Sequence, residues 1–208
     1  MSRKIIPVES EVFSIKKMPS GDSAELAGED PEHVDVEFQE SAEAAEAEPE
    51  ESFSLEEISQ WRVGKCLLAL KKQIDDIAPR RNKASDGTIG DTRHCGSPNP
   101  KSDHCPKVRD GTIGVVTAMD ITHDPNGGCD ANTIAESIRA DRDSRVKYVI
   151  WNRRIFASQS VNGKEAWTWR TYVGSNPHTK HVHVSVNADK ASVDSQEAWN
   201  LSQLQAIG

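Results

Sequence analysis

Long apolar runs are missing from this sequence of 208 residues. No stretch approaches the roughly 18 consecutive apolar residues that a membrane-spanning helix needs, so insertion into a membrane is not expected. The first residues include basic side chains but no apolar segment of the kind that secretory signal peptides contain. We therefore expect synthesis in the cytoplasm without a signal peptide.

Cysteine is scarce as well. The four cysteines, at positions 66, 95, 105 and 129, are too few for a disulfide-rich scaffold. No two of them form a Cys-x-x-Cys pair, so zinc-finger and thioredoxin motifs are not supported. Apolar residues make up 36% of the chain, below the roughly 45–50% of a typical globular protein, which indicates that part of the chain is not folded.

Acidic residues are concentrated at the front of the chain. Residues 1–60 contain 17 acidic and 4 basic side chains, a net charge of −13, whereas residues 61–208 contain 16 acidic and 21 basic ones, a net charge of +5. The basic residues of the second part are scattered rather than clustered, so a nucleic-acid partner is not expected.

The run from Ser41 to Glu51 offers almost nothing to bury, which is typical of disordered segments. We predict an acidic disordered tail or linker over residues 1–53 and a folded domain over residues 54–208. A solvated linker is the simpler interpretation, but an arm that docks on an unidentified partner stays open. The side chains that would dock in that case are Phe13, Phe38 and Phe53.

A helix is expected at the start of the folded part. Ser54 and Glu57 match a capping box, apolar residues then recur at helical spacing, and Pro79 ends the pattern. The apolar residues of the helical face are Val63, Leu67, Leu70, Ile74 and Ile77.

Residues 79–114 look irregular and contain the pentapeptide DGTIG twice, which predicts two similar turns.

Strand patterns dominate after residue 114. A buried strand is expected over Val115–Ile121, a short helix capped by Asp130 follows, and Asn162-Gly163 is a hairpin-turn signal. A last helix is expected to begin at Asp194. These elements predict an α+β domain with a small, mostly antiparallel sheet flanked by helices. The other expected strands are Val146–Trp151, Arg154–Ala157, the segment around Trp167 and Trp169, and His181–Val186.

Six of the seven histidines lie between residues 94 and 183. His181 and His183 are two residues apart on an expected strand, so both imidazoles point to the same side. Asp120 lies in an otherwise apolar strand, where a carboxylate needs a hydrogen bond, an ion pair or a metal ion. Taken alone, a chance pair of histidines and a structural ion pair explain these residues at least as well as a metal does. Together with His104, however, Asp120 and His183 form a set of two imidazoles and one carboxylate that suits a hydrolytic zinc ion.

The order of these motifs resembles the zinc peptidases of the D-alanyl-D-alanine carboxypeptidase group. It is most similar to the bacteriophage and bacterial murein peptidases with the Hedgehog/DD-peptidase fold. The similarity covers roughly residues 60–190. Its motifs are Ser102-Asp103-His104, Val115–Ile121, Asn176-Pro177-His178 and His181–Ser185, with Arg145–Ile155 and Trp167–Arg170 in support.

The resemblance implies that His104, Asp120 and His183 bind Zn²⁺. His181 matches the catalytic base, a position where many members have Glu and some murein endopeptidases have His. The substrate would be a peptide bond in the peptidoglycan stem or cross-bridge, hydrolysed by a zinc-activated water. Such an enzyme would be a phage-type endolysin or carboxypeptidase that reaches the cell wall after release from the cytoplasm, or that is carried in a virion.

Other residues near these motifs are candidates for supporting roles. His178 and His123 would orient the metal ligands, and Lys101, Trp169 and Arg170 would bind the substrate. Two alternatives stay open. The His-Cys pairs at residues 94–95 and 104–105 suggest a cysteine nucleophile. The same scaffold could also be a non-catalytic cell-wall-binding or virion module.

Overall fold

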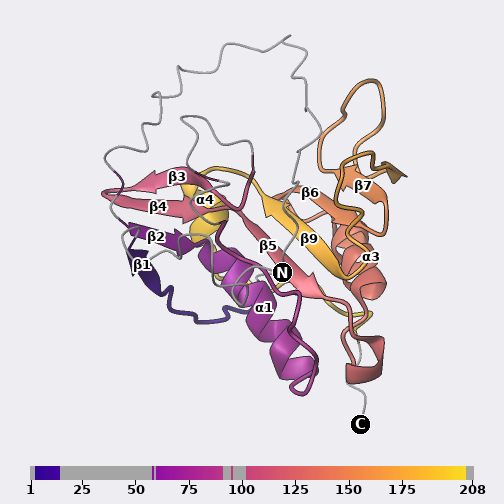
Figure 1. Ribbon diagram of the computed structural model, residues 1–208, viewed down its shortest axis with the longest axis horizontal. Helices are drawn as coiled ribbons and strands as arrows, with labels where there is room; N and C mark the ends of the chain where they lie inside the picture. Colours follow the sequence, from indigo (N-terminus) through magenta and orange to yellow (C-terminus); the bar gives the residue numbers. More distant parts are fainter. Residues whose placement is uncertain (1–2, 15–57, 59, 91–94, 96–101, 205–208) are drawn as a thin grey trace.

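The computed structural model describes residues 3–14, 58, 60–90, 95 and 102–204. These residues form an α+β structure with one four-stranded and one five-stranded sheet, as the patterns predict for the fold class. Figure 1 shows the second sheet beside helix α3 and the first sheet at the other end of the molecule. In this part of the chain no helix is long and apolar enough to cross a membrane.

The first helix begins later than expected. Helix α1 spans Lys65–Ile77, and the residues before it form strand β2, Gln60–Val63. Val63 therefore belongs to a strand and not to the helical face, and the capping-box residues Ser54 and Glu57 lie outside the described residues. Gly64 is at the N-cap, where its amide donates to the carbonyl of Val116, so the start of the helix is fixed by the neighbouring sheet.

The irregular segment contains a hairpin. Strands β3, Pro106–Asp110, and β4, Ile113–Val116, join β2 and β1, Val12–Ser14, in the order β1-β2-β4-β3. The second DGTIG copy forms the β3–β4 turn, in which Gly111 has a φ of 63°. The first copy forms a bridge to Asp120 instead, so the prediction of two similar turns was wrong.

The expected strand over residues 115–121 is divided between the two sheets. Strand β4 ends at Val116, and β5, Ala118–Thr122, begins the second sheet. Thr117 lies between them because its amide donates to Asp103 and its carbonyl accepts from Val186, outside either ladder. One apolar run therefore connects both sheets, which a period-two pattern alone does not reveal.

The second sheet has the order β5-β9-β6-β7-β8 and is antiparallel throughout. Strands β6, Val146–Trp151, β7, Arg154–Ala157, and β9, His181–Val186, match their expected ranges. Strand β8 is only Arg170–Thr171, so Trp167 and Trp169 lie outside it, contrary to the strand prediction. The expected turn at Asn162-Gly163 is present, with a bridge between Val161 and Lys164.

The two faces of this sheet differ in chemistry. One face packs against α1 and α3, Ala131–Asp141, through apolar side chains such as Val182, Val184 and Val149. Asp130 caps α3 as expected, by accepting from the amide of Asn132. Because directly paired residues of an antiparallel sheet share a face, Asp120 and His183 both lie on the opposite face.

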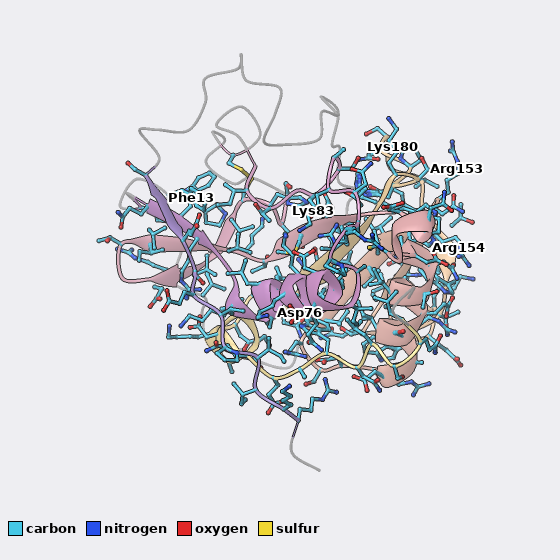
Figure 2. All side chains as sticks on the ribbon, turned by 90° about the horizontal axis from the view of Figure 1, so that it is seen from below. Phe13, Asp76, Lys83, Arg153, Arg154 and Lys180 are labelled. Carbon is cyan, nitrogen blue, oxygen red and sulfur yellow. A yellow bond between two sulfur atoms is a disulfide. The ribbon has the colours of Figure 1, made fainter. Side chains whose placement is uncertain are left out.

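Two terminal elements differ from the expectation. The last helix, α4, spans Lys190–Asp194 and is capped by Asp189, so the chain leaves a helix at Asp194 rather than beginning one. At the other end, residues 3–14 lie against the domain although their composition placed them in the tail. Phe13 is thereby placed on β1, at the opposite end of the molecule from Lys180 (Figure 2).

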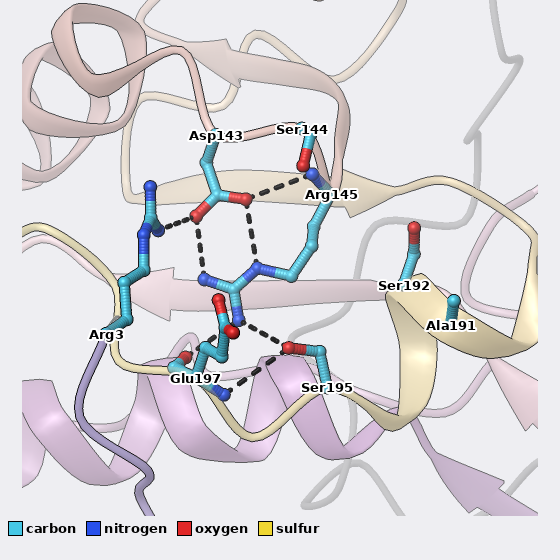
Figure 3. A pocket seen from close by; sticks show the side chains of 8 residues that line it. All are labelled: Arg3, Asp143, Ser144, Arg145, Ala191, Ser192, Ser195 and Glu197. Atoms are coloured by element: carbon cyan, nitrogen blue, oxygen red, sulfur yellow. Dashed lines mark hydrogen bonds and ion pairs between the residues drawn. The ribbon is translucent and has the colours of Figure 1, made fainter. Parts of the chain in front are cut away.

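Ion pairs anchor the N-terminal segment. Arg3 binds Asp141 and Asp143, and Asp143 also holds Arg145 through two side-chain hydrogen bonds of 2.9 and 2.7 Å. Arg3, Asp143 and Arg145 line a small pocket, in which both guanidinium groups face the carboxylate of Asp143 (Figure 3). Its charges are mutually neutralised, so it is a structural junction of the N-terminal segment with the domain.

Candidate metal centre

Three side chains from distant parts of the sequence converge beside the second sheet. His104 comes from the turn before β3, Asp120 from β5 and His183 from the neighbouring strand β9. Nε2 of His104 lies 3.2 Å from Nδ1 of His183 and 3.3 Å from Oδ2 of Asp120. Metal–ligand bonds of about 2.0–2.1 Å in a tetrahedron place ligand atoms roughly 3.3 Å apart. Two of the three ligand pairs therefore have the spacing of a tetrahedral site, and the third, Nδ1 of His183 with Oδ1 of Asp120, is closer at 2.9 Å.

The second nitrogen of each imidazole is also held. Nδ1 of His104 lies 2.8 Å from the carbonyl of Thr88, and Nε2 of His183 lies 3.0 Å from Oγ of Ser185. When each ring donates an N–H to its oxygen, the other nitrogen offers its lone pair to a metal ion at the centre. Both oxygens are therefore acceptors suited to the tautomers that metal ligation requires.

A buried carboxylate continues this network behind His183. Asp103 is 2% exposed and lies 3.1 Å from the ammonium group of Lys147, and Ser185 also hydrogen-bonds to it. Burial raises the pKa of the Asp103 carboxyl, but Lys147 outweighs this effect and lowers it. Asp103 and Ser185 were not assigned roles from the sequence. Ser185 could have been, since it is two residues beyond His183 and shares its face of the strand.

The first DGTIG copy closes the centre from the side. The main chains of Gly87 and Asp120 exchange hydrogen bonds of 2.8 and 3.2 Å. A Cβ at Gly87 would lie only 2.9 Å from Oδ2 of Asp120, so glycine leaves room for the carboxylate. Thr88, the next residue, thereby brings its carbonyl to His104.

The electrostatic environment favours an ionised carboxylate among imidazoles. Burial raises the pKa of Asp120, but His104 and His181 outweigh it and hold that pKa well below its usual range. Burial lowers the pKa of His104, and Asp120 outweighs it, raising the pKa to about 9. The carboxylate of Asp120 thus stays ionised, and its negative charge attracts a cation to the site.

His181 and His178 border the centre. Nε2 of His181 lies 3.8 Å from Oδ2 of Asp120 and 3.0 Å from Nδ1 of His178. His178 is 1% exposed and its backbone has a φ of 47°, which a non-glycine residue adopts rarely. The structure therefore brings the expected base and one of the two expected orienting histidines to the metal ligands.

The other candidates lie apart from this group or outside the described residues. Nδ1 of His123 accepts from the amide of Ala131, at the start of α3, and its ring contacts Trp151. Trp169 donates to Glu136 of α3, on the apolar side of the sheet, whereas Arg170 is paired with Ile155 on the face of the metal ligands. Lys101 and His94 lie outside the described residues.

A disulfide joins Cys95 and Cys105. Neither sulfur is a thiol in this state, so neither can be the nucleophile that the two His-Cys pairs suggested. Cys105 directly follows His104, whose carbonyl accepts from the amide of Gly90. The bond therefore fixes the turn that presents a metal ligand, and the spacing of the cysteines alone did not predict it.

Two groups of side chains could hold a metal ion: His104 with Asp120 and His183, and Asp120 with His178 and His181. The first matches the expected ligand set. Comparisons with models of known families, with curated proteins and with solved structures gave no match to this chain. The chemistry of the site therefore follows from its own donor atoms.

Proposed function

We propose that the chain is a zinc-dependent peptidase that hydrolyses a peptide bond in the stem or cross-bridge of peptidoglycan, on a Hedgehog/DD-peptidase-like fold. The supporting observation is the convergence of two imidazole nitrogens and one carboxylate at ligand spacing, with both outer nitrogens hydrogen-bonded. Two His and one carboxylate leave a fourth position open in tetrahedral zinc sites, which is the donor set of many zinc hydrolases. When bound there, zinc lowers the pKa of water to about 7 and polarises a carbonyl group.

The remaining steps belong to the side chains. His181 directs Nε2 at the ligand group, where it can take a proton and pass it to the leaving amine. His178, in contact with the same nitrogen, holds the ring of His181 in place. Asp120 and His183 are neighbours across β5 and β9, so the rigid sheet fixes their separation during turnover.

In this proposal the protein is a phage-type lytic enzyme. It acts on the cell wall after release from the cytoplasm, or from within a virion. The acidic segment before the domain binds a partner or acts as a spacer. Peptidoglycan is the partner of the folded domain.

A second candidate is a non-catalytic module that binds the cell wall or belongs to a virion. One contact favours it: Nδ1 of His178 lies 3.0 Å from Nε2 of His181, the nitrogen that a base would use. If that hydrogen bond persists with substrate bound, His181 cannot accept a proton. The site would then hold a metal and cut nothing.

Metal content and wall digestion separate these candidates. Full-length protein, His183→Ala and the control His123→Ala are analysed by elemental mass spectrometry after exposure to zinc, then assayed on purified sacculi. We expect about one zinc per chain and release of soluble peptides for wild type and His123→Ala, and neither for His183→Ala. Zinc binding and sedimentation with sacculi without release of peptides would favour the second candidate. Absence of zinc from folded wild-type protein would contradict both versions of the metal site.

A further inference from the structure

Arg170 lies in the same row of the sheet as the metal ligands. Asp120 is paired with His183, His183 with Ile150, Ile150 with Ile155, and Ile155 with Arg170. Directly paired residues share a face, so the guanidinium group projects from the face that carries the metal centre.

Apolar side chains separate the two ends of this row. They form a cluster of their own, distinct from the main core on the other face of the sheet. Its members are Tyr148, Ile150, Ala157 and Tyr172, with Ile155 and Val161 packed against them. The four members are 2–7% exposed, so a cation at one end and a candidate metal centre at the other flank a mostly buried apolar cluster.

The charge of Arg170 has no partner among the residues that the structure describes. Its Nε is buried without a hydrogen bond, and none of the ion pairs in this part of the chain includes it. Burial lowers the pKa of its guanidinium, and no carboxylate of a described residue offsets the effect. The neighbouring Arg154 differs, because it stacks on Trp169 and donates to Asn132. A partly buried, unpaired guanidinium is costly for the fold and is suited to a ligand that supplies the missing carboxylate.

The sheet also fixes the distance to that carboxylate. His183 and Arg170 are three strands apart, which is roughly 14 Å at a strand spacing of about 4.8 Å. An extended peptide covers about 3.3–3.6 Å per residue, so this distance corresponds to three or four residues. If the enzyme removed only the last residue of a peptide, the terminal carboxylate of that residue would lie much too close to the metal to reach Arg170.

We propose that Arg170 forms an anion subsite for a carboxylate that lies three or four residues from the bond that is cut. This inference rests on the proposed function and makes the substrate an acidic peptide that reaches from the metal centre to Arg170 in an extended form. Cleavage is then internal to the peptide, as in an endopeptidase, and not removal of a single terminal residue.

Binding tests the subsite separately from catalysis. The probes are muropeptides released from purified sacculi, either native or with their carboxyl groups amidated. Affinity is measured by calorimetry on metal-stripped, full-length protein, in which no cleavage occurs, for wild type, Arg170→Gln, Arg170→Lys and the control Arg154→Gln. In parallel, kcat/KM is measured on the zinc-loaded proteins by mass spectrometry of the products.

We expect amidation to weaken binding to wild type and Arg154→Gln roughly tenfold, the effect of losing one bidentate charged contact. Arg170→Gln should bind both peptides equally, at the level of wild type with amidated peptide, and Arg170→Lys should restore part of the difference. The carboxylate could belong to an internal acidic residue or to the C-terminus of the peptide, and shortening the native peptides by one C-terminal residue separates these sources. The affinity should stay the same if Arg170 binds an internal acidic residue, and it should fall if Arg170 binds the C-terminal carboxylate.

Three results would overturn the subsite: no binding of native peptides to wild type, an equal effect of amidation on wild type and Arg170→Gln, or no effect of amidation on wild type. Release of a single C-terminal residue as the main product would overturn the internal position of the cut. If zinc-loaded wild type cleaves nothing but amidation weakens its binding through Arg170, the proposed peptidase activity fails while the subsite stands.

Discussion

Nε2 of His183 lies 3.0 Å from Oγ of Ser185, and Ser185 in turn hydrogen-bonds to the buried carboxylate of Asp103. In the tautomer with its N–H at Nε2, the ring donates to the hydroxyl and the hydroxyl donates to the carboxylate, so the three groups form one directed chain. In that tautomer Nδ1 of His183, which lies 2.9 Å from Oδ1 of Asp120, is the nitrogen that a metal would bind. Lys147 neutralises the far end of the chain.

Ser185→Ala should therefore weaken metal binding without unfolding the protein. The substitution removes the acceptor that fixes the tautomer of His183, and loss of such an outer partner typically costs roughly 10–100-fold in metal affinity. Competition against a chromophoric chelator measures the affinity, and Ser192→Ala in α4 is the matched control. Equal affinities for wild type and Ser185→Ala would show that β9 alone orients the ring.

His181→Ala should separate metal binding from turnover. Its nitrogen lies 3.8 Å from Asp120, next to the ligand group of His104 and His183 rather than within it. We expect zinc content close to that of wild type and a loss of activity on sacculi of roughly 10²–10⁴-fold, the usual contribution of a general base. Loss of zinc from His181→Ala would instead show that the group of Asp120, His178 and His181 holds the metal.

The disulfide between Cys95 and Cys105 should contribute to stability and to the metal site. Replacing both cysteines by serine removes a short closed loop, and we expect the free energy of unfolding to fall by about 2–3 kcal/mol. Metal affinity should fall as well, because Cys105 adjoins His104. Urea unfolding and the chelator assay measure the two effects.

Thiol titration provides the control for this variant. Unfolded wild type should show two free thiols, those of Cys66 and Cys129, and reductant should make wild type behave like the double variant. Four thiols in unreduced wild type would contradict the disulfide.

The site was largely predictable because its residues are marked by periodicity. His181 and His183 alternate with valines that lie in the core, and Asp120 interrupts an apolar strand, so each position shows an anomaly in the sequence. Their convergence depends on the pairing of β5 with β9, which strand patterns do not specify. The family resemblance supplied the ligand set as an expectation, and the register of the two strands now places Asp120 opposite His183.

Features fixed by tertiary contacts were not predictable. The break at Thr117 depends on hydrogen bonds to Asp103 and Val186, residues far from it in opposite directions of the chain. The late start of α1 depends on the pairing of β2 with β4, which overrides the helical spacing that Val63 shares with the residues after it. In both cases a long-range contact determines the conformation of a locally ambiguous segment.

The junction of Asp143, Arg145 and Arg3 should make stability depend on pH in the acid range. Burial raises the pKa of Asp143, but hydrogen bonds and charge from Arg145 outweigh it and lower that pKa in the folded protein. A carboxyl whose folded pKa is depressed stabilises the fold above its unfolded pKa of about 3.9, and this contribution is lost as pH falls through the folded value.

Asp143→Asn should therefore cost about 3 kcal/mol at pH 7, since it leaves Arg145 buried beside a neutral amide. The variant should also lose less stability than wild type between pH 5 and pH 2, measured by thermal unfolding at each pH. The exposed Asp76→Asn is the control, and equal pH profiles for Asp143→Asn and wild type would mean that other carboxyl groups govern acid unfolding.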